Sequence, residues 1–144
     1  DDEILEEYFM IANQHVHVID EFNEFMKEEI YQMMVATTQD RDELILKNTT
    51  TLKVARWWDK ACDIIPCNGG KDVAIQKVLD FYNFNKDEAM AFGDGGNDIS
   101  MLKYVGTGVA MGNAKDSVKA IADYITDSVQ EDGIVSALKH FEII

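Results

Sequence analysis

Alternating short apolar runs and amphipathic segments in the second half of the chain restrict its fold more than any other feature. Three apolar runs have the length and composition of strands: 88–94, 108–111 and 123–128. Segments with helical spacing surround them at 71–84, 97–105, 114–122 and 131–141. Strands that alternate with helices predict right-handed crossovers and a largely parallel sheet, so we expect an α/β fold.

The first half of the chain has a different rhythm, and the halves meet near Pro66, the one proline in the sequence. We expect helices at 3–12, 19–30 and 39–48, the last one capped by Asp40. We expect strands at 30–38, 51–58 and 62–67. A tight turn separates the last two strands, which indicates antiparallel pairing. The sequence therefore predicts an α+β piece over 1–66 and an α/β piece over 67–144.

Charge and cysteine content restrict the possible partners. The 144 residues carry 27 Asp and Glu against 13 Lys and Arg, a formal net charge of −14. This charge repels nucleic acid and anionic membranes, and no run approaches the roughly 18 apolar residues of a membrane span. We expect neither partner. The cysteines, Cys62 and Cys67, have no zinc-ligand spacing, and we expect reduced thiols in a cytoplasmic protein.

The stretch GDGGND, from Gly93 to Asp98, directly follows the first strand of the second half. Asp94 therefore lies at the carboxyl end of a parallel strand, where such sheets bind ligands. Asp98 adds a second carboxylate, and Asn97 can donate its amide to an anion. Carboxylates of this kind suit Mg²⁺, which also takes water and phosphate oxygens as ligands.

Two other interpretations of this stretch can be considered, a helix N-cap and a Ca²⁺ loop. Asp, Asn and Gly are the usual residues at a helix N-cap, which for GDGGND alone is the more common outcome. A Ca²⁺ loop is excluded because Val105 stands where the glutamate ligand is required. A further charge opens the helix before this strand: Lys71, in a first turn that disfavours a cation. An isolated lysine is usually only solvated, so it is a weak indication of function by itself.

Taken together, these residues resemble a known family. GDGGNDISML is similar to the last conserved motif of the haloacid dehalogenase-like phosphohydrolases, in its GDxxNDxxM form. The passage 108–138 is similar to the segment after this motif in the Cof-type subfamily, and 63–79 resembles the passage from its cap domain to its motif lysine. The resemblance implies the C-terminal half of a Rossmann-like parallel core sheet over 67–144, with a partial α+β cap domain over 1–66.

The resemblance also implies an activity, a cofactor and residue roles. Asp94 would ligate Mg²⁺, and Asp98 would support the metal site through water and serve as a catalytic residue. Asn97 would contact the transferring phosphoryl group. Lys71 would bind the substrate phosphate and neutralise its charge and that of the nucleophile. The implied reaction is Mg²⁺-dependent hydrolysis of small phosphorylated metabolites, such as sugar phosphates, through a phospho-aspartate.

One family motif has no counterpart in this sequence. The nucleophile belongs to a DxD motif, and the nearest stretch, VHVIDEF, has Phe22 where the second aspartate should stand. We therefore expect this chain to be the C-terminal part of a larger enzyme and inactive alone. The strand before Asp94 would then have an open edge, which predicts self-association or swapping. The alternative is a non-catalytic binding module that retains a vestigial phosphate and metal site.

A few residues outside these motifs are weaker candidates. His15 and His17 could face the same way on a strand, but no third metal ligand is evident and we expect structural roles. Arg56, Trp57 and Trp58 lie in the expected hairpin of the cap. Ordinary strand positions are the simpler interpretation for these three, and a substrate contact through an exposed tryptophan or through the arginine is the alternative.

Overall fold

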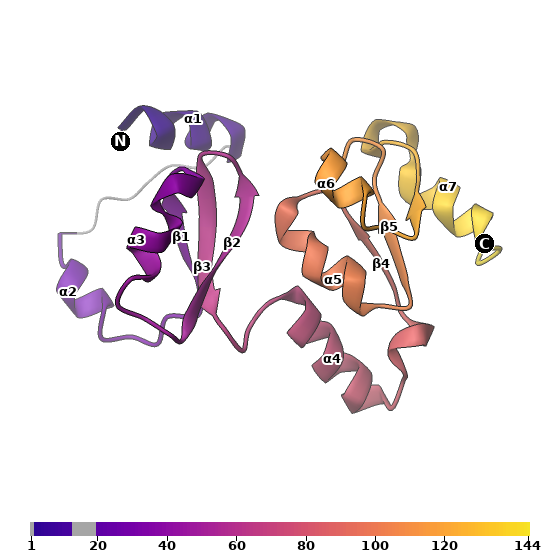
Figure 1. Cartoon of the computed structure of the whole chain (residues 1–144), viewed down its shortest axis with the longest axis horizontal. Coiled ribbons are helices and arrows are strands. Elements are labelled where there is room, and N and C mark those ends of the chain that lie inside the picture. The colour runs from indigo at the N-terminus through magenta and orange to yellow at the C-terminus, as the bar shows by residue number, and fades with distance from the viewer. Residues whose placement is uncertain (1, 13–19) are drawn as a thin grey trace. The chain divides into compact units, whose positions relative to one another are not determined.

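The chain divides into two compact units, Asp1–Cys67 and Asn68–Ile144, in a computed structural model that describes residues 2–12 and 20–144 (Figure 1). The sequence placed the boundary after Pro66. Each unit contains a three-stranded sheet. In the described part of the chain, no helix is long and apolar enough to cross a bilayer.

The first unit is an antiparallel sheet with short helices. Its strands are β1 (Met33–Ala36), β2 (Leu52–Trp58) and β3 (Ala61–Pro66), in the order β1-β3-β2. Its helical elements are α1 (Asp2–Ala12), α2 (Phe22–Phe25), η1 (Gln39–Arg41) and α3 (Asp42–Leu46). The central strand β3 carries the buried residues Ala61, Cys62 and Ile64. β2 and β3 pair antiparallel, which confirms the hairpin predicted from the sequence.

Two predictions for the first unit are wrong. The helix expected over 19–30 is reduced to the four residues of α2, with residue 19 outside the described residues. Phe22, Met26 and Ile30 are 63%, 48% and 41% exposed, so little packing stabilises a helix there, and short helices are marginal without packing. Asp40 does not cap its helix, because it lies inside η1 and accepts a hydrogen bond from the Thr38 hydroxyl at 2.5 Å.

The second unit is a parallel sheet connected by helices, as predicted. Its strands are β4 (Met90–Gly93), β5 (Thr107–Ala110) and β6 (Tyr124–Ile125), in the order β4-β5-β6. Its longer helices are α4 (Lys71–Tyr82), α5 (Ile99–Tyr104), α6 (Asp116–Lys119) and α7 (Gly133–His140). Short 3-10 turns complete it: η2 (Lys86–Glu88), η3 (Gly96–Asp98) and η4 (Val129–Glu131).

The core of the second unit lies between β5 and its neighbouring helices. Leu102, Val109 and Val118 are at most 1% exposed, and they come from α5, β5 and α6. A Cβ on Gly108 would lie 2.3 Å from the carbonyl oxygen of Leu102, so only glycine permits α5 to pack this closely on β5. This packing sets α5, the helix after the GDGGND turn, against the sheet.

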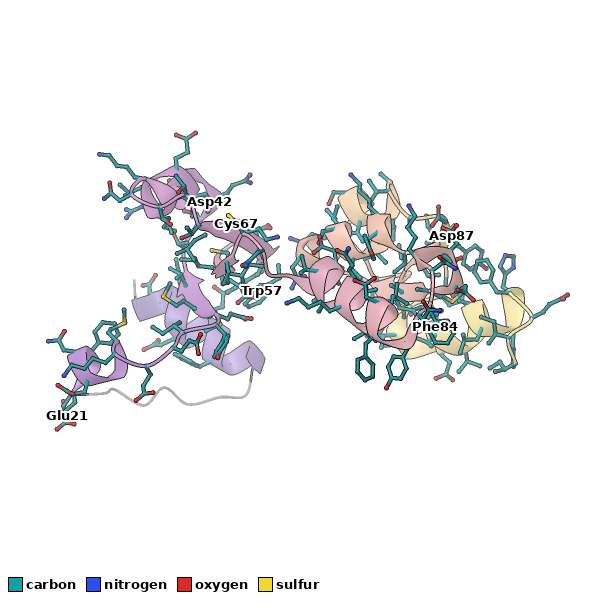
Figure 2. All side chains as sticks on the ribbon, turned by 90° about the horizontal axis from the view of Figure 1, so that it is seen from below. Glu21, Asp42, Trp57, Cys67, Phe84 and Asp87 are labelled. Atoms are coloured by element: carbon teal, nitrogen blue, oxygen red, sulfur yellow. The ribbon has the colours of Figure 1, made fainter. Side chains whose placement is uncertain are left out.

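One edge of this sheet is open. Among the described residues, β4 pairs with β5 alone. Exposed apolar side chains occur on α4 and just after it: Val78, Phe81, Tyr82 and Phe84, the last of which is marked in Figure 2. An open strand edge is where another polypeptide segment can add. Self-association through this edge stays a prediction.

Truncating the core should cost far more stability than truncating the exposed helix face. We expect Leu102→Ala to lower the free energy of unfolding of the second unit by about 2–5 kcal/mol, because it leaves a cavity under α5. Val78→Ala is the matched control, since Val78 is 55% exposed. Denaturant dependence of hydrogen exchange at the β5 amides measures both. Equal losses in the two variants would contradict the assignment of the core.

Candidate functional site

The turn after β4 is organised by the side chain of Asp98. Its Oδ2 accepts hydrogen bonds from the backbone N–H groups of Asp94 and Gly95, both at 3.0 Å. The backbone N–H of Asp98 donates in turn to the carbonyl of Gly95 at 3.0 Å. Asp98 is buried, with 5% of its surface exposed. Asp98 precedes α5 but makes no side-chain N-cap bond to it, so the N-cap role considered for this stretch does not describe Asp98, whose Oδ2 instead holds the turn before it.

The other oxygen of Asp98 binds Lys71. The Nζ of Lys71, the first residue of α4, contacts Asp98 Oδ1 and forms an ion pair with it. Gly70 precedes Lys71 at a φ of 124°, a conformation that favours glycine and lets the chain turn into α4. About half of the Lys71 side chain is exposed, at 49%. An ammonium has three donors, so Lys71 can bind Asp98 and still reach an anion.

The ionisation of Asp98 follows from these contacts. Burial by itself raises the pKa of Asp98, because it disfavours the charged form. The hydrogen bonds from Lys71 and from the N–H groups of Gly95 and Asp94 act in the opposite direction and hold the pKa below its ordinary value. Asp98 is therefore a carboxylate at neutral pH, and Lys71 faces a fixed negative charge.

Asp94 is the exposed carboxylate of the turn. Its Oδ2 accepts a hydrogen bond at 3.0 Å from the side-chain amide of Asn113. Its carbonyl oxygen accepts the N–H of Lys115 at 3.4 Å. A carboxylate has about four acceptor sites, so Asp94 retains capacity for a further ligand. Asn113 was not predicted from the sequence, although its position just after β5 placed it at the same edge of the sheet.

Asn97 lies over the glycine turn. A Cβ on Gly95 would stand 2.7 Å from Asn97 Oδ1, so a side chain at position 95 would collide with Asn97. Asn97 is half-buried in this arrangement. The structure thus places Asp94, Asn97 and Asp98 in one turn and joins Lys71 to it through Asp98.

The donor set of this turn fits Mg²⁺ with some ligands supplied from elsewhere. In residues 2–12 and 20–144 there is no group of three or more His, Cys, Asp or Glu side chains arranged around a metal. Both oxygens of Asp98 are engaged, which leaves Asp94 as the available carboxylate. Mg²⁺ commonly takes one or two carboxylates and fills its shell with water and phosphate oxygens. Asp94 fits that pattern as a ligand, and Asp98 fits as its support.

Arg56, the weaker candidate in the first unit, is committed to internal contacts. Its guanidinium donates to the carbonyl of Thr37 at 2.7 Å and forms an ion pair with Asp42, which is marked in Figure 2. The Arg56 side chain is 16% exposed, and its Nε is buried without a hydrogen-bond partner. These contacts tie β2 to the start of α3, so a structural role accounts for this residue.

The two tryptophans of β2 lie side by side rather than on opposite faces. Trp57 and Trp58 are both half-buried, and their rings stack with centroids 6.3 Å apart and planes inclined by 22°. The pairing of β2 with β3 shifts register between Arg56 and Trp58. A bulge of this kind breaks the alternation of faces along the strand, so both rings are partly covered and neither is the exposed tryptophan of the substrate-contact alternative. His15 and His17 lie outside the described residues.

Comparison with known proteins identifies the family. Residues 2–138 match the family model of the haloacid dehalogenase-like hydrolases. The chain belongs to this family. The match confirms the family inferred from GDGGND, and the parallel sheet confirms the predicted α/β fold class.

Individual relatives agree with this assignment. The Bacillus subtilis protein YkrA is 40% identical over 117 residues, which are 81% of this chain and 45% of that protein. The 5-amino-6-(5-phospho-D-ribitylamino)uracil phosphatase YcsE of Bacillus subtilis is 51% identical over 71 residues, 49% of this chain and 28% of its own length. A solved structure of a sugar phosphatase of HAD subclass IIB superposes with a TM-score of 0.88 at 35% identity, covering 100% of this chain and 55% of that one. The chain thus spans about half the length of YkrA and of this sugar phosphatase.

The depressed pKa of Asp98 predicts a specific loss of stability in acid. A carboxyl whose pKa is lower in the folded than in the unfolded chain stabilises fully above its unfolded pKa, and this contribution is lost as the pH falls through the folded pKa. We therefore expect the free energy of unfolding to decrease as the pH is lowered below about 4, the ordinary pKa of an aspartate. Asp98→Asn should show a shallower decline, and Lys71→Met an intermediate one, because the backbone donors remain. Chemical denaturation at a series of pH values measures how steeply the free energy of unfolding changes with pH in each protein. The same slope in all three would contradict the lowered pKa of Asp98.

Proposed function

We propose that this chain supplies the lysine and the acidic turn of a Mg²⁺-dependent phosphohydrolase that acts on small phosphorylated metabolites, such as sugar phosphates. One observation carries the proposal: Asp98 holds Lys71 at the turn that presents the exposed Asp94 at the carboxyl end of β4. The names of the relatives YcsE and the subclass IIB sugar phosphatase support this substrate class.

In this proposal the cationic and amide side chains bind the phosphate, and the exposed carboxylate binds the metal. The half-exposed ammonium of Lys71 binds the substrate phosphate, and its ion pair with Asp98 keeps it directed into the site. Asn97 donates its amide to a phosphoryl oxygen, and Asp94 holds the metal. Bound Mg²⁺ supplies charge neutralisation to the transferring phosphoryl group. An acidic protein can bind an anion in this way because the positive charge is local.

The attacking carboxylate would come from residues outside this chain. In the reaction we propose, that aspartate attacks phosphorus and displaces the alcohol of the substrate, which takes a proton from a second aspartate, also outside this chain, as it leaves. Water then attacks the phospho-aspartate, releasing inorganic phosphate and restoring the carboxylate. The open edge of β4 is where a strand that carries such a residue can pair.

A phosphatase assay tests this proposal. We expect the isolated chain to release no phosphate from p-nitrophenyl phosphate with Mg²⁺, and a longer polypeptide that also contains the nucleophile to release it. In the longer polypeptide Asp94→Asn should abolish turnover. Asp87→Asn is the matched control. Asp87 is exposed on η2, which precedes β4 (Figure 2), so this substitution removes the same charge at the opposite, amino end of the strand.

Each failure in this assay has a distinct meaning. Turnover by the isolated chain would contradict the placement of the nucleophile outside it. Near-normal turnover of the Asp94→Asn polypeptide would contradict the metal role. A longer polypeptide that binds inorganic phosphate and Mg²⁺ without turnover would instead favour the non-catalytic binding module.

A further inference from the structure

A bridge runs from the exposed carboxylate of the turn to the loop that follows β6, and Asn113 forms it. The side-chain amide of Asn113 donates from Nδ2 to Asp94 Oδ2 at 3.0 Å. Its Oδ1 accepts the backbone N–H of Val129 at 3.0 Å. Asn113 follows β5, Asp94 follows β4 and Val129 opens η4 after β6. The bridge therefore connects the segments that follow all three parallel strands.

The two partners fix the orientation of this amide. A carboxylate accepts hydrogen bonds and a backbone N–H donates one. Rotating the Asn113 amide by half a turn would set its oxygen against the Asp94 carboxylate and its NH₂ group against the N–H of Val129. Both contacts would then be repulsive. Only one of the two amide orientations satisfies both neighbours, so Asn113 reaches Asp94 as a donor.

The backbone that carries Asn113 is closely held. The N–H of Met111 donates to the carbonyl of Gly93 at 3.0 Å, and the N–H of Gly112 donates to the carbonyl of Asp127 at 3.0 Å. A Cβ on Gly112 would lie 2.6 Å from the backbone nitrogen of Ser128. The segment before Asn113 is therefore clamped between the ends of β4 and β6, which limits how far its side chain can move.

We propose that Asn113 is a positioning residue that orients the Asp94 carboxylate toward the metal. The inference rests on the proposed function, in which Asp94 ligates Mg²⁺. An exposed aspartate samples several rotamers, and a ligand that must be ordered on binding lowers metal affinity. The bond to Oδ2 restrains the carboxylate before the ion arrives and leaves Oδ1 for coordination. Hydrogen-bond partners of metal ligands typically change affinity 10–100-fold when they are removed.

The experiment measures the dissociation constant of Mg²⁺ by NMR titration of the backbone amides, in the longer polypeptide that also contains the nucleophile. Asn113→Ala removes the bridge, and we expect it to weaken Mg²⁺ binding roughly 10-fold or more. Ser128→Ala is the matched control, because it breaks the hydroxyl bond to Glu131 at 2.6 Å in the same loop. The Ser128 hydroxyl is directed to Glu131 rather than to Asp94 or Asn113, so we expect wild-type affinity in that variant.

A second variant tests the anchor of the bridge without changing Asn113. Val129→Pro removes the backbone N–H that donates to Asn113 Oδ1. Proline suits the first position of a helical turn, and Ser128, at φ −70° and ψ 167°, has the conformation that residues before proline adopt. We expect Val129→Pro to weaken Mg²⁺ binding by less than Asn113→Ala, because the donor to Asp94 remains but loses its restraint. If Asn113→Ala does not fold, this variant carries the test.

The outcomes separate this inference from the proposed function. Asp94→Asn is titrated alongside, and wild-type affinity in that variant, or no Mg²⁺ binding by the unaltered longer polypeptide, would overturn the metal role and the positioning role together. Loss of binding in Asp94→Asn with wild-type affinity in Asn113→Ala would overturn the positioning role alone. An equal loss in Ser128→Ala and Asn113→Ala would also overturn it, since general loosening of the loop would then explain both.

Discussion

The buried carboxylate of Asp98 is the interaction on which the rest of the site depends. Burying a charge costs free energy unless hydrogen bonds and an opposite charge compensate, and Asp98 has both. Its three donors come from the turn after β4 and from the first residue of α4, which are joined through this one side chain. A neutral residue could cap the turn, but it could not also hold the ammonium of Lys71. The charge of Asp98 therefore both holds the turn after β4 and binds Lys71, whereas the sequence shows the turn and the lysine as separate features.

The parallel sheet determines where these side chains meet. Because β4, β5 and β6 run in the same direction, the segments that follow them emerge at one edge, and Asp94, Asn113 and Val129 all lie in such segments. Close packing at Gly108 holds α5, which follows the GDGGND turn, against β5. The site is thus a set of short polar connections on a fixed frame, which suits a reaction that depends on positioning and charge neutralisation.

Much of this arrangement is predictable from the sequence, and the exceptions have physical causes. Alternation of strands and helices predicts the parallel sheet, and the residues of GDGGND together with Lys71 predict the family. The expected helix over 19–30 fails because periodicity does not show whether a partner surface exists. The bulge in β2 and the bridge of Asn113 depend on contacts between segments distant in the sequence, which local patterns do not encode. The direct pairing of Lys71 with Asp98, 27 residues apart, is a contact of the same kind.

A double-mutant cycle on Lys71 and Asp98 tests the central claim most directly. The free energy of unfolding of the second unit is measured for the unaltered chain, for Lys71→Met, for Asp98→Asn and for the double variant. If Asp98 joins the turn to α4 through Lys71, the two changes are coupled by roughly 0.5 kcal/mol or more, a modest value because Lys71 is half exposed. Strictly additive losses would contradict the account, since Lys71 and Asp98 would then be neighbours without an interaction that organises the site.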